Sequence, residues 1–244
     1  MQSKAANKLE LGRIIAPACP QRAMPKDQSE MVNQLLYGEP LEILKKEKQW
    51  VKVRSLIDDY EGWIDFKMMN EASINMNDFS NRSGELILEN SNGLMLPYGS
   101  FIPGEAPSRK QKVDINLLRK HAERFLGAPY LWGGKTIMGI DCSGLVQLLY
   151  AVQGVALPRD ASQQVELGET VGFLEESVTG DLAFFGKDEG KITHVGMIIK
   201  DEDAMIIHAS GQVRLDPIDQ QGIFAKERNE YSHNFRTIKR IIHD

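Results

Sequence analysis

The stretch Asp141-Cys-Ser-Gly-Leu-Val-Gln-Leu-Leu-Tyr-Ala-Val152 decides the fold of the second half of the chain. Its apolar residues recur at helical spacing and form one stripe, namely Leu145, Val146, Leu148, Leu149 and Val152. Asp141 is placed to cap the first turn, and Gly154 is placed to end the helix. The sequence therefore predicts a helix over about residues 142–152, with Cys142 in its first turn.

A cysteine at the start of a helix suits nucleophilic chemistry. The unpaired N–H groups and partial positive charge of a helix N-terminus favour thiolate over thiol, so we expect a lowered pKa for Cys142. The same N–H groups can stabilise an oxyanion during acyl transfer. The alternative is a buried structural cysteine. The flanking Asp141, Ser143 and Gly144 make that alternative weaker.

Two histidines are candidates for the base that activates this thiol. His194 and His208 lie on neighbouring predicted strands joined by residues 200–203. An antiparallel hairpin centred on Asp201 would set them directly opposite each other, with Cβ atoms roughly 5 Å apart. One imidazole could then orient the other, which completes a predicted triad with Cys142. A zinc site of the same three residues is the weaker alternative, because short-spaced ligand pairs are missing.

Composition and charge exclude several classes of protein. The 244 residues include 29 Lys and Arg against 34 Asp and Glu, and the net charge of −5 argues against bulk nucleic-acid or polybasic membrane binding. Two cysteines exclude a disulfide framework. The longest apolar run, Leu148–Val152, is too short to span a membrane. The first residues lack the apolar core of a secretory signal, so we expect a cytoplasmic protein or an exported one whose signal is absent here.

The composition of the chain changes near residue 110. Before it, short alternating stretches between residues 40 and 66, with a turn at 58–62, predict a small β-barrel. After it, residues 113–126 have helical spacing, capped by Asp114 and ended by Gly127, and strands return after residue 178. His121, His233, His243 and Cys19 have no supporting context, and we assign them no role in the site.

Taken together, the motifs of the second half resemble the NlpC/P60 family of papain-like cysteine peptidases. The matching segments, in the order of the family, are residues 129–134, 141–144, 157–160, 179–185, 193–196 and 207–209. The resemblance implies an α+β fold, in which the helix that bears the cysteine packs on an antiparallel sheet. It makes Cys142 the nucleophile, His194 the base and His208 the third member, with no metal or cofactor. It also places Tyr130 beside the oxyanion, and Trp132 and Ser143 along the site.

The first half resembles a bacterial SH3 domain. The similarity is clearest at residues 38–44, 50–54 and 61–65. It implies three parts: an SH3-like domain at residues 1–72, a β-containing linker or degenerate second SH3 unit at 73–112, and the catalytic domain at 113–244.

The two halves together resemble γ-D-glutamyl-L-diamino acid endopeptidases that process peptidoglycan peptides. These enzymes cleave L-Ala-γ-D-Glu from L-Lys or meso-diaminopimelate and require a free N-terminal L-Ala. The resemblance implies that Asp160, Glu61 and Tyr98 hold the amine, and that the role is recycling of cell-wall peptides. A peptidoglycan-derived peptide would be the partner, with no nucleic acid and no membrane. The alternatives are a broader hydrolase or amidase acting on polymeric cell wall, a non-enzymatic wall-binding module, and acyl transfer to a lipid or amine.

Overall fold

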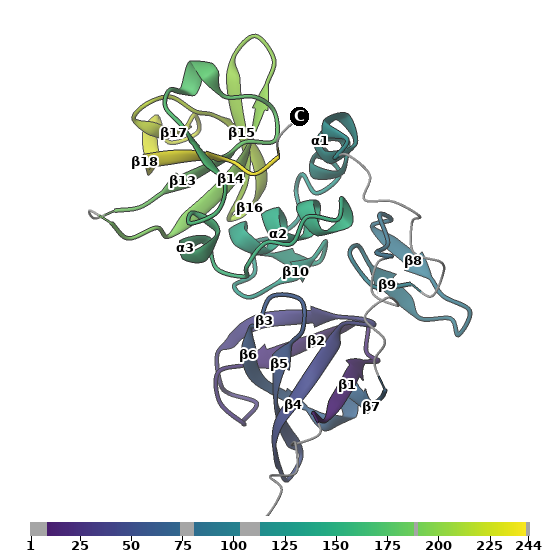
Figure 1. Cartoon of the computed structure of the whole chain (residues 1–244). Helices are drawn as coiled ribbons and strands as arrows, with labels where there is room; N and C mark the ends of the chain where they lie inside the picture. Colours follow the sequence, from purple (N-terminus) through teal and green to yellow (C-terminus); the bar gives the residue numbers. More distant parts are fainter. Residues whose placement is uncertain (1–8, 74–80, 103–112, 188–189, 243–244) are drawn as a thin grey trace, which may run out of the picture.

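The computed structural model describes residues 9–73, 81–102, 113–187 and 190–242. It has two large antiparallel sheets, and a layer of helices and short strands lies between them (Figure 1). No helix in the described ranges is long and apolar enough to cross a membrane.

The N-terminal sheet has seven strands in the order β3-β2-β6-β5-β4-β1-β7. Buried and partly exposed residues alternate along several of its strands, and the buried ones form one apolar core that includes Leu41, Val53 and Ile64. This is the pattern of a sheet with one covered face. The elements are β1 (Leu11–Ile14), β2 (Ala18–Arg22), β3 (Met31–Leu36), β4 (Pro40–Glu47), β5 (Trp50–Ser55), β6 (Glu61–Asp65), a 3-10 turn (Phe66–Met68) and β7 (Met69–Glu71).

A hairpin of β8 (Ile87–Glu89) and β9 (Met95–Pro97) follows, at the side of both sheets (Figure 1). Tyr98, directly after it, is buried in the core of the C-terminal half, together with Leu36 from β3. The predicted domain boundaries at residues 1, 112 and 244 lie outside the described residues. The division of the chain into three parts therefore stays a prediction.

The C-terminal sheet has the order β12-β18-β13-β14-β15-β16, with β17 paired to β18. Its strands are β12 (Glu169–Val171), β13 (Leu182–Phe185), β14 (His194–Lys200), β15 (Ala204–Ser210), β16 (Gln212–Pro217), β17 (Gly222–Ala225) and β18 (Glu230–Arg240). The other elements are α1 (Ile115–Glu123), β10 (Lys135–Thr136), β11 (Gly139–Ile140), α2 (Cys142–Val152), α3 (Ala161–Gln164) and a 3-10 turn (Leu174–Glu176). This is the α+β arrangement that the sequence predicts.

Helix α2 confirms the predicted bounds and cap. Asp141 accepts a hydrogen bond from the Gly144 N–H at 2.7 Å, and residues 142–150 are all buried. The helix packs against α1 on one side and against β14 and β15 on the other. Its burial explains why the apolar stripe is wider than that of a surface helix.

The β14–β15 register differs from the predicted hairpin centre. Met197 faces Ile207 and Lys200 faces Ala204, so the turn is centred on Glu202 and not on Asp201. The connection has three residues, with the Asp201 N–H bonded to the Asp203 carbonyl. His194 is therefore a diagonal and not a direct neighbour of His208. A shift of two residues keeps both side chains on the same face of the sheet.

Strand β3 of the N-terminal sheet borders the loop that precedes α2. Trp132 donates from Nε1 to Glu30 Oε1 at 2.7 Å. At Gly133, φ is +77°, and a Cβ there would lie 2.6 Å from the Met31 carbonyl oxygen, so only glycine lets the two backbones approach this closely.

A buried polar network joins the two halves below this loop. Arg159 is 1% exposed, and its guanidinium pairs with the Asp141 carboxylate. It also donates to Asn33 Oδ1 at 2.7 Å and to Ser143 Oγ at 2.8 Å. The network thus ties β3, the cap of α2 and the segment before α3 together.

Replacing Arg159 by alanine is expected to cost about 3–5 kcal/mol of unfolding free energy, because it leaves the buried Asp141 carboxylate unpaired. Urea denaturation measures this loss. Arg119→Ala is the matched control: its pairs with Glu123 and Asp201 are largely exposed, so the expected cost is under about 1 kcal/mol. Equal losses in the two variants would contradict a structural role for the buried network.

Candidate active site

A chain of hydrogen bonds runs from His194 to a carboxylate. His194 Nε2 lies 2.8 Å from His208 Nδ1, and His208 Nε2 lies 3.1 Å from Asp216 Oδ2. His194 is the first residue of β14, His208 is on β15 and Asp216 is on β16, so three neighbouring strands carry the chain. The missing side chain of Gly196 gives His208 room: a Cβ there would lie 2.9 Å from His208 Cβ.

The hydrogen-bond partners fix the histidine tautomers. The Asp216 carboxylate is an acceptor, because its bonds to His208 and Arg214 keep its pKa below the usual range despite burial. His208 Nε2 then carries a proton and Nδ1 accepts. His194 Nε2 must donate to that acceptor, which leaves His194 Nδ1 with a free lone pair. This nitrogen is the one that can take a proton from a thiol.

Asp216 was not found from the sequence. The available signal was weak: Arg214 and Asp216 alternate on a short stretch after the strand of His208. Arg214 forms ion pairs with Asp216 and Glu227, and it thereby holds the carboxylate in place.

Cys142 lies next to the start of β14. The Val195 N–H donates a hydrogen bond to its sulfur. Burial, followed by the nearby Asp141 carboxylate, raises the pKa of Cys142 to about 11, and the N–H groups of Val195 and Ser143 offset this only in part. This corrects the expectation of a lowered pKa, because desolvation of a thiol that is 7% exposed outweighs the helix N-terminus.

The resting site is therefore neutral. Burial, together with the neighbouring His208 and His233, holds the pKa of His194 well below its ordinary value. His194 directly precedes Val195, the N–H donor to the Cys142 sulfur, and a neutral imidazole in this place can take the thiol proton during attack on a carbonyl carbon, rather than before it. Tyr130 lies close by: burial and the proximity of Cys142 raise its pKa to about 12, so its hydroxyl keeps its proton and can donate.

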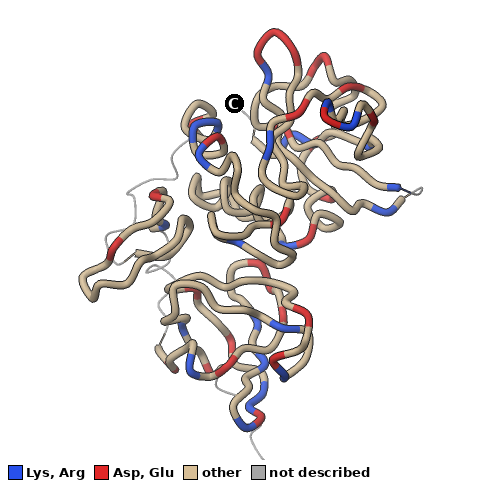
Figure 2. Tube along the Cα trace, turned by 180° about the vertical axis from the view of Figure 1, so that it is seen from behind, with Lys and Arg blue, Asp and Glu red and all other residues tan. Residues whose placement is uncertain are grey.

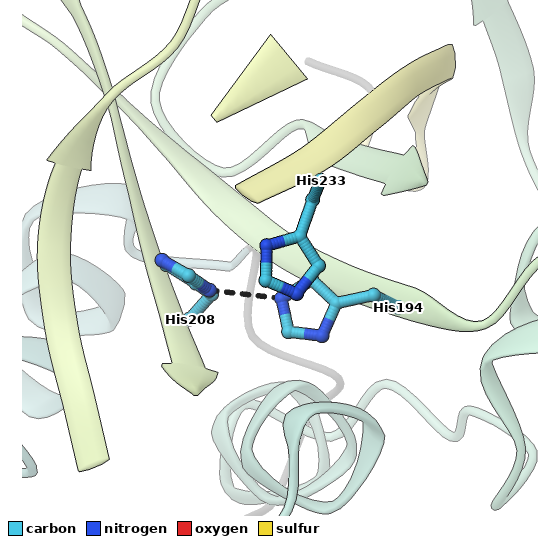
Figure 3. Close-up of side chains that lie close together, drawn as sticks. All are labelled: His194, His208 and His233. Carbon is cyan, nitrogen blue, oxygen red and sulfur yellow. Dashed lines mark hydrogen bonds between the residues drawn. The ribbon is translucent and has the colours of Figure 1, made fainter. Parts of the chain in front are cut away.

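His233 completes a cluster of three imidazoles, which the sequence did not reveal. Its ring stacks on that of His194, with centroids 4.0 Å apart and planes 26° apart (Figure 3). One nitrogen from each of His194, His208 and His233 lies within 4.8 Å of the others, which is close enough for a metal ion. His194 Nε2 and His208 Nδ1 are, however, already bonded to each other at 2.8 Å, and a metal bound to both of these atoms would displace that bond. The geometry is that of a proton relay, in which the ring of His233 stacks against the ring of the base, His194.

The residues predicted to hold substrate fall into two groups. Trp132 is 59% exposed beside the loop before α2, and Ser143 is buried between Asp141 and Arg159. Asp160 is the residue before α3, and burial is the main cause that raises its pKa above the usual range.

Glu61 and Tyr98 are placed differently from the expectation. Glu61 is exposed and forms ion pairs with Lys52 and Arg54 along the N-terminal sheet. Tyr98 is 1% exposed, and its hydroxyl bonds to His121 Nδ1 at 2.8 Å inside the core, so it has a packing role.

Tyr60 is the aromatic residue of the N-terminal half that lies near Asp160. Burial, then the negative charge of Asp160, raises the pKa of Tyr60 to about 12. Asp58, two residues before it, accepts a hydrogen bond from Gln147 of α2 at 2.8 Å. The β5–β6 connection, and not Glu61 or Tyr98, therefore brings the N-terminal half to the site.

Iodoacetamide is expected to alkylate Cys142 well before Cys19 in the native protein. Cys19 is fully buried, and burial raises its pKa to about 12. Because the pKa of Cys142 is about 11, its labelling rate should rise from pH 7 to pH 9. Peptide mapping by mass spectrometry at several pH values measures both effects. A plateau in rate from pH 5 to pH 7 would instead indicate a preformed thiolate–imidazolium pair.

Acid is expected to destabilise the protein through its buried histidines. Burial lowers the pKa of His233 to about 4, whereas in the unfolded chain it is about 6.5. As pH falls from about 6.5 to 4, the unfolded state binds the proton first, so stability is lost over this window. His233→Phe keeps a stacked ring without the titration. Its Tm should therefore fall less between pH 7 and pH 5 than that of the unmodified chain. An unchanged pH dependence would show that His233 does not titrate in this way.

Comparison with known proteins gives two family matches. Residues 127–230 match the NlpC/P60 family, and residues 22–67 match the bacterial dipeptidyl-peptidase SH3 domain. The "Gamma-D-glutamyl-L-lysine dipeptidyl-peptidase" of Bacillus subtilis (strain 168) is 40% identical over 95 residues, which cover 38% of this chain and 32% of that protein. The "Dipeptidyl-peptidase 6" of Lysinibacillus sphaericus is 27% identical over 263 residues, which cover 85% and 92%. The match thus spans about a third of the first relative and nearly all of the second.

A solved structure shares the fold over both halves. It is the crystal structure of an NlpC/P60 family protein from Bacillus cereus ATCC 10987, with a TM-score of 0.76 and 20% identity, and the match covers 96% of this chain and 100% of that one. This fold includes the N-terminal sheet, the helix that begins with Cys142 and the strand that begins with His194. The chain carries an NlpC/P60 domain preceded by a bacterial SH3 domain.

Proposed function

We propose that this protein is a cysteine peptidase that cleaves the γ-D-Glu–diamino acid bond of peptidoglycan peptides. The observation that carries the proposal is the chain of hydrogen bonds from His194 through His208 to Asp216. His194 directly precedes Val195, whose N–H donates to the Cys142 sulfur. Relatives named gamma-D-glutamyl-L-lysine dipeptidyl-peptidase and dipeptidyl-peptidase 6 support this choice of bond.

The arrangement accounts for each step of hydrolysis. The Cys142 sulfur attacks the γ-carbonyl carbon as His194 Nδ1 takes the thiol proton. The oxyanion meets the N–H groups at the start of α2 and the Tyr130 hydroxyl. His194 then gives its proton to the leaving amine. Water, deprotonated by His194, releases L-Ala-γ-D-Glu from the enzyme. His208 and Asp216 keep His194 in the required tautomer and stabilise its charged form.

One residue from each half, Tyr60 from the N-terminal half and Asp160 from the C-terminal half, selects the end of the substrate. Asp160 and Tyr60 can replace the water around the ammonium group of a free N-terminal L-Ala. A peptide still linked to glycan has no such ammonium group. We therefore propose recycling of released peptides, in the cytoplasm, as the role of this protein.

Mass spectrometry of the products tests this function. The unmodified protein should release L-Ala-γ-D-Glu from L-Ala-γ-D-Glu-L-Lys and from its diaminopimelate analogue, and Cys142→Ala should lose at least about a thousandfold in kcat. N-acetylated peptides should resist cleavage. Equal cleavage of acetylated peptides would favour a broader wall hydrolase. No cleavage of any peptide, with retention on isolated cell walls, would favour a wall-binding module.

Asp160→Asn tests the amine pocket separately. Loss of one charge-assisted contact should raise KM for free-amine peptides about tenfold with little change in kcat. Glu166→Gln is the matched control, since this exposed carboxylate lies just after α3. An unchanged KM for Asp160→Asn would place amine recognition elsewhere.

A further inference from the structure

The histidine cluster, formed by His194, His208 and His233, has a lone pair that the proposed reaction does not use. The Ser232 hydroxyl has one proton and donates it to the Ile223 carbonyl at 3.2 Å. His233 Nδ1 lies 2.9 Å from Ser232 Oγ, and it must be the donor of that second bond. The lone pair of His233 is therefore on Nε2, which leaves this nitrogen available as a ligand.

Two rings of the histidine cluster are oriented as metal-bound histidines are. A histidine that binds a metal through one nitrogen donates the N–H of its other nitrogen to a carboxylate or another oxygen. His208 Nε2 donates to Asp216 Oδ2 at 3.1 Å, which leaves Nδ1 for a metal. His233 Nδ1 donates to Ser232 Oγ, which leaves Nε2. Asp216 and Ser232 are thus placed as the outer partners of a metal site.

The nitrogens of the cluster are close to the spacing of a zinc site. Zinc binds imidazole nitrogens at about 2.0–2.1 Å in a tetrahedron, so two of its ligand nitrogens lie about 3.3 Å apart. His194 Nε2 and His208 Nδ1 are 2.8 Å apart, and one nitrogen of His233 lies within 4.8 Å of one nitrogen of each of the other two rings (Figure 3). The His233 side chain is partly exposed, so its ring has room to turn toward an ion. Small side-chain movements are therefore enough to enclose the metal.

We propose that the histidine cluster binds Zn²⁺ reversibly through His194 Nε2, His208 Nδ1 and His233 Nε2, with water as the fourth ligand, and that the bound ion switches the peptidase off. Zinc binds the Nε2 lone pair of His194, so the proton of that nitrogen moves through water to Nδ1 and the ring stays neutral. A protonated Nδ1 cannot take the thiol proton of Cys142. The metal site stands without the proposed function, whereas the inhibition rests on it.

Metal binding to the Cys142→Ala variant tests the ligand set, because this variant has no thiol at the site. Calorimetry with Zn²⁺ should show one ion bound per chain, and Co²⁺ should give the visible absorption of a tetrahedral site without a sulfur-to-metal charge-transfer band. Loss of an outer hydrogen-bond partner costs about 10–100-fold in metal affinity, so adding Ser232→Ala should weaken binding at least about tenfold. Adding His233→Phe, which keeps the ring without its nitrogens, should weaken binding at least about a hundredfold.

Exposed carboxylates provide the matched control. They gather at the β14–β15 turn, at Asp201, Glu202 and Asp203 (Figure 2). Carboxylate oxygens suit Mg²⁺ and Ca²⁺, whereas imidazole suits Zn²⁺. Adding Glu202→Gln and Asp203→Asn to Cys142→Ala should therefore leave Zn²⁺ affinity unchanged. Loss of binding in this control, or full binding after His233→Phe, would place the ion elsewhere and overturn the site. Absence of binding to Cys142→Ala itself would overturn it as well.

Hydrolysis by the protein with Cys142 intact tests the inhibition. Zn²⁺ should stop the release of L-Ala-γ-D-Glu from L-Ala-γ-D-Glu-L-Lys, and EDTA should restore it. In His233→Phe the Zn²⁺ concentration for half inhibition, measured against that variant's own rate, should rise at least about a hundredfold. Full activity at saturating Zn²⁺, or inhibition that His233→Phe leaves unchanged, would overturn the inhibitory role. Zn²⁺ binding by a protein that hydrolyses no peptide would remove the proposed function and leave the metal site standing.

Discussion

The ion pair between Arg159 and Asp141 is the constraint on which the rest of the site depends. The Asp141 carboxylate accepts the N–H of Gly144 and the N–H of Gly133, so it caps α2 and fixes the loop before it. Such a buried carboxylate is tolerable only if a cation and several donors replace its water. Arg159 supplies the cation and also bonds Asn33 of the N-terminal sheet. One buried charge therefore sets the start of the nucleophile helix and the position of the neighbouring domain.

The burial of the Arg159–Asp141 ion pair has a chemical consequence for the nucleophile, Cys142. The same burial that makes the Arg159–Asp141 pair strong also desolvates Cys142, and Asp141 adds a negative charge beside the sulfur. The pKa of Cys142 rises as a result, although the thiol sits at a helix N-terminus. Reactivity must then come from the base. His194 has a free nitrogen because His208 and Asp216 fix its tautomer, and the stacked ring of His233 limits how it can turn.

Local patterns in the sequence were enough to predict the elements, and long-range contacts were not. Helix α2 followed from apolar spacing and an Asp cap, both of which act within a few residues. The β14–β15 register was predicted wrongly by two residues. Two registers that differ by two residues place the same side chains on the same face, so the alternation of the sequence cannot distinguish them. Asp216 and His233 come from strands 22 or more residues beyond His194, so no local pattern links them to it. Tyr60 and Glu61 are adjacent in sequence, and only the strand pairing of Glu61 with Arg54 shows which one turns away from the site.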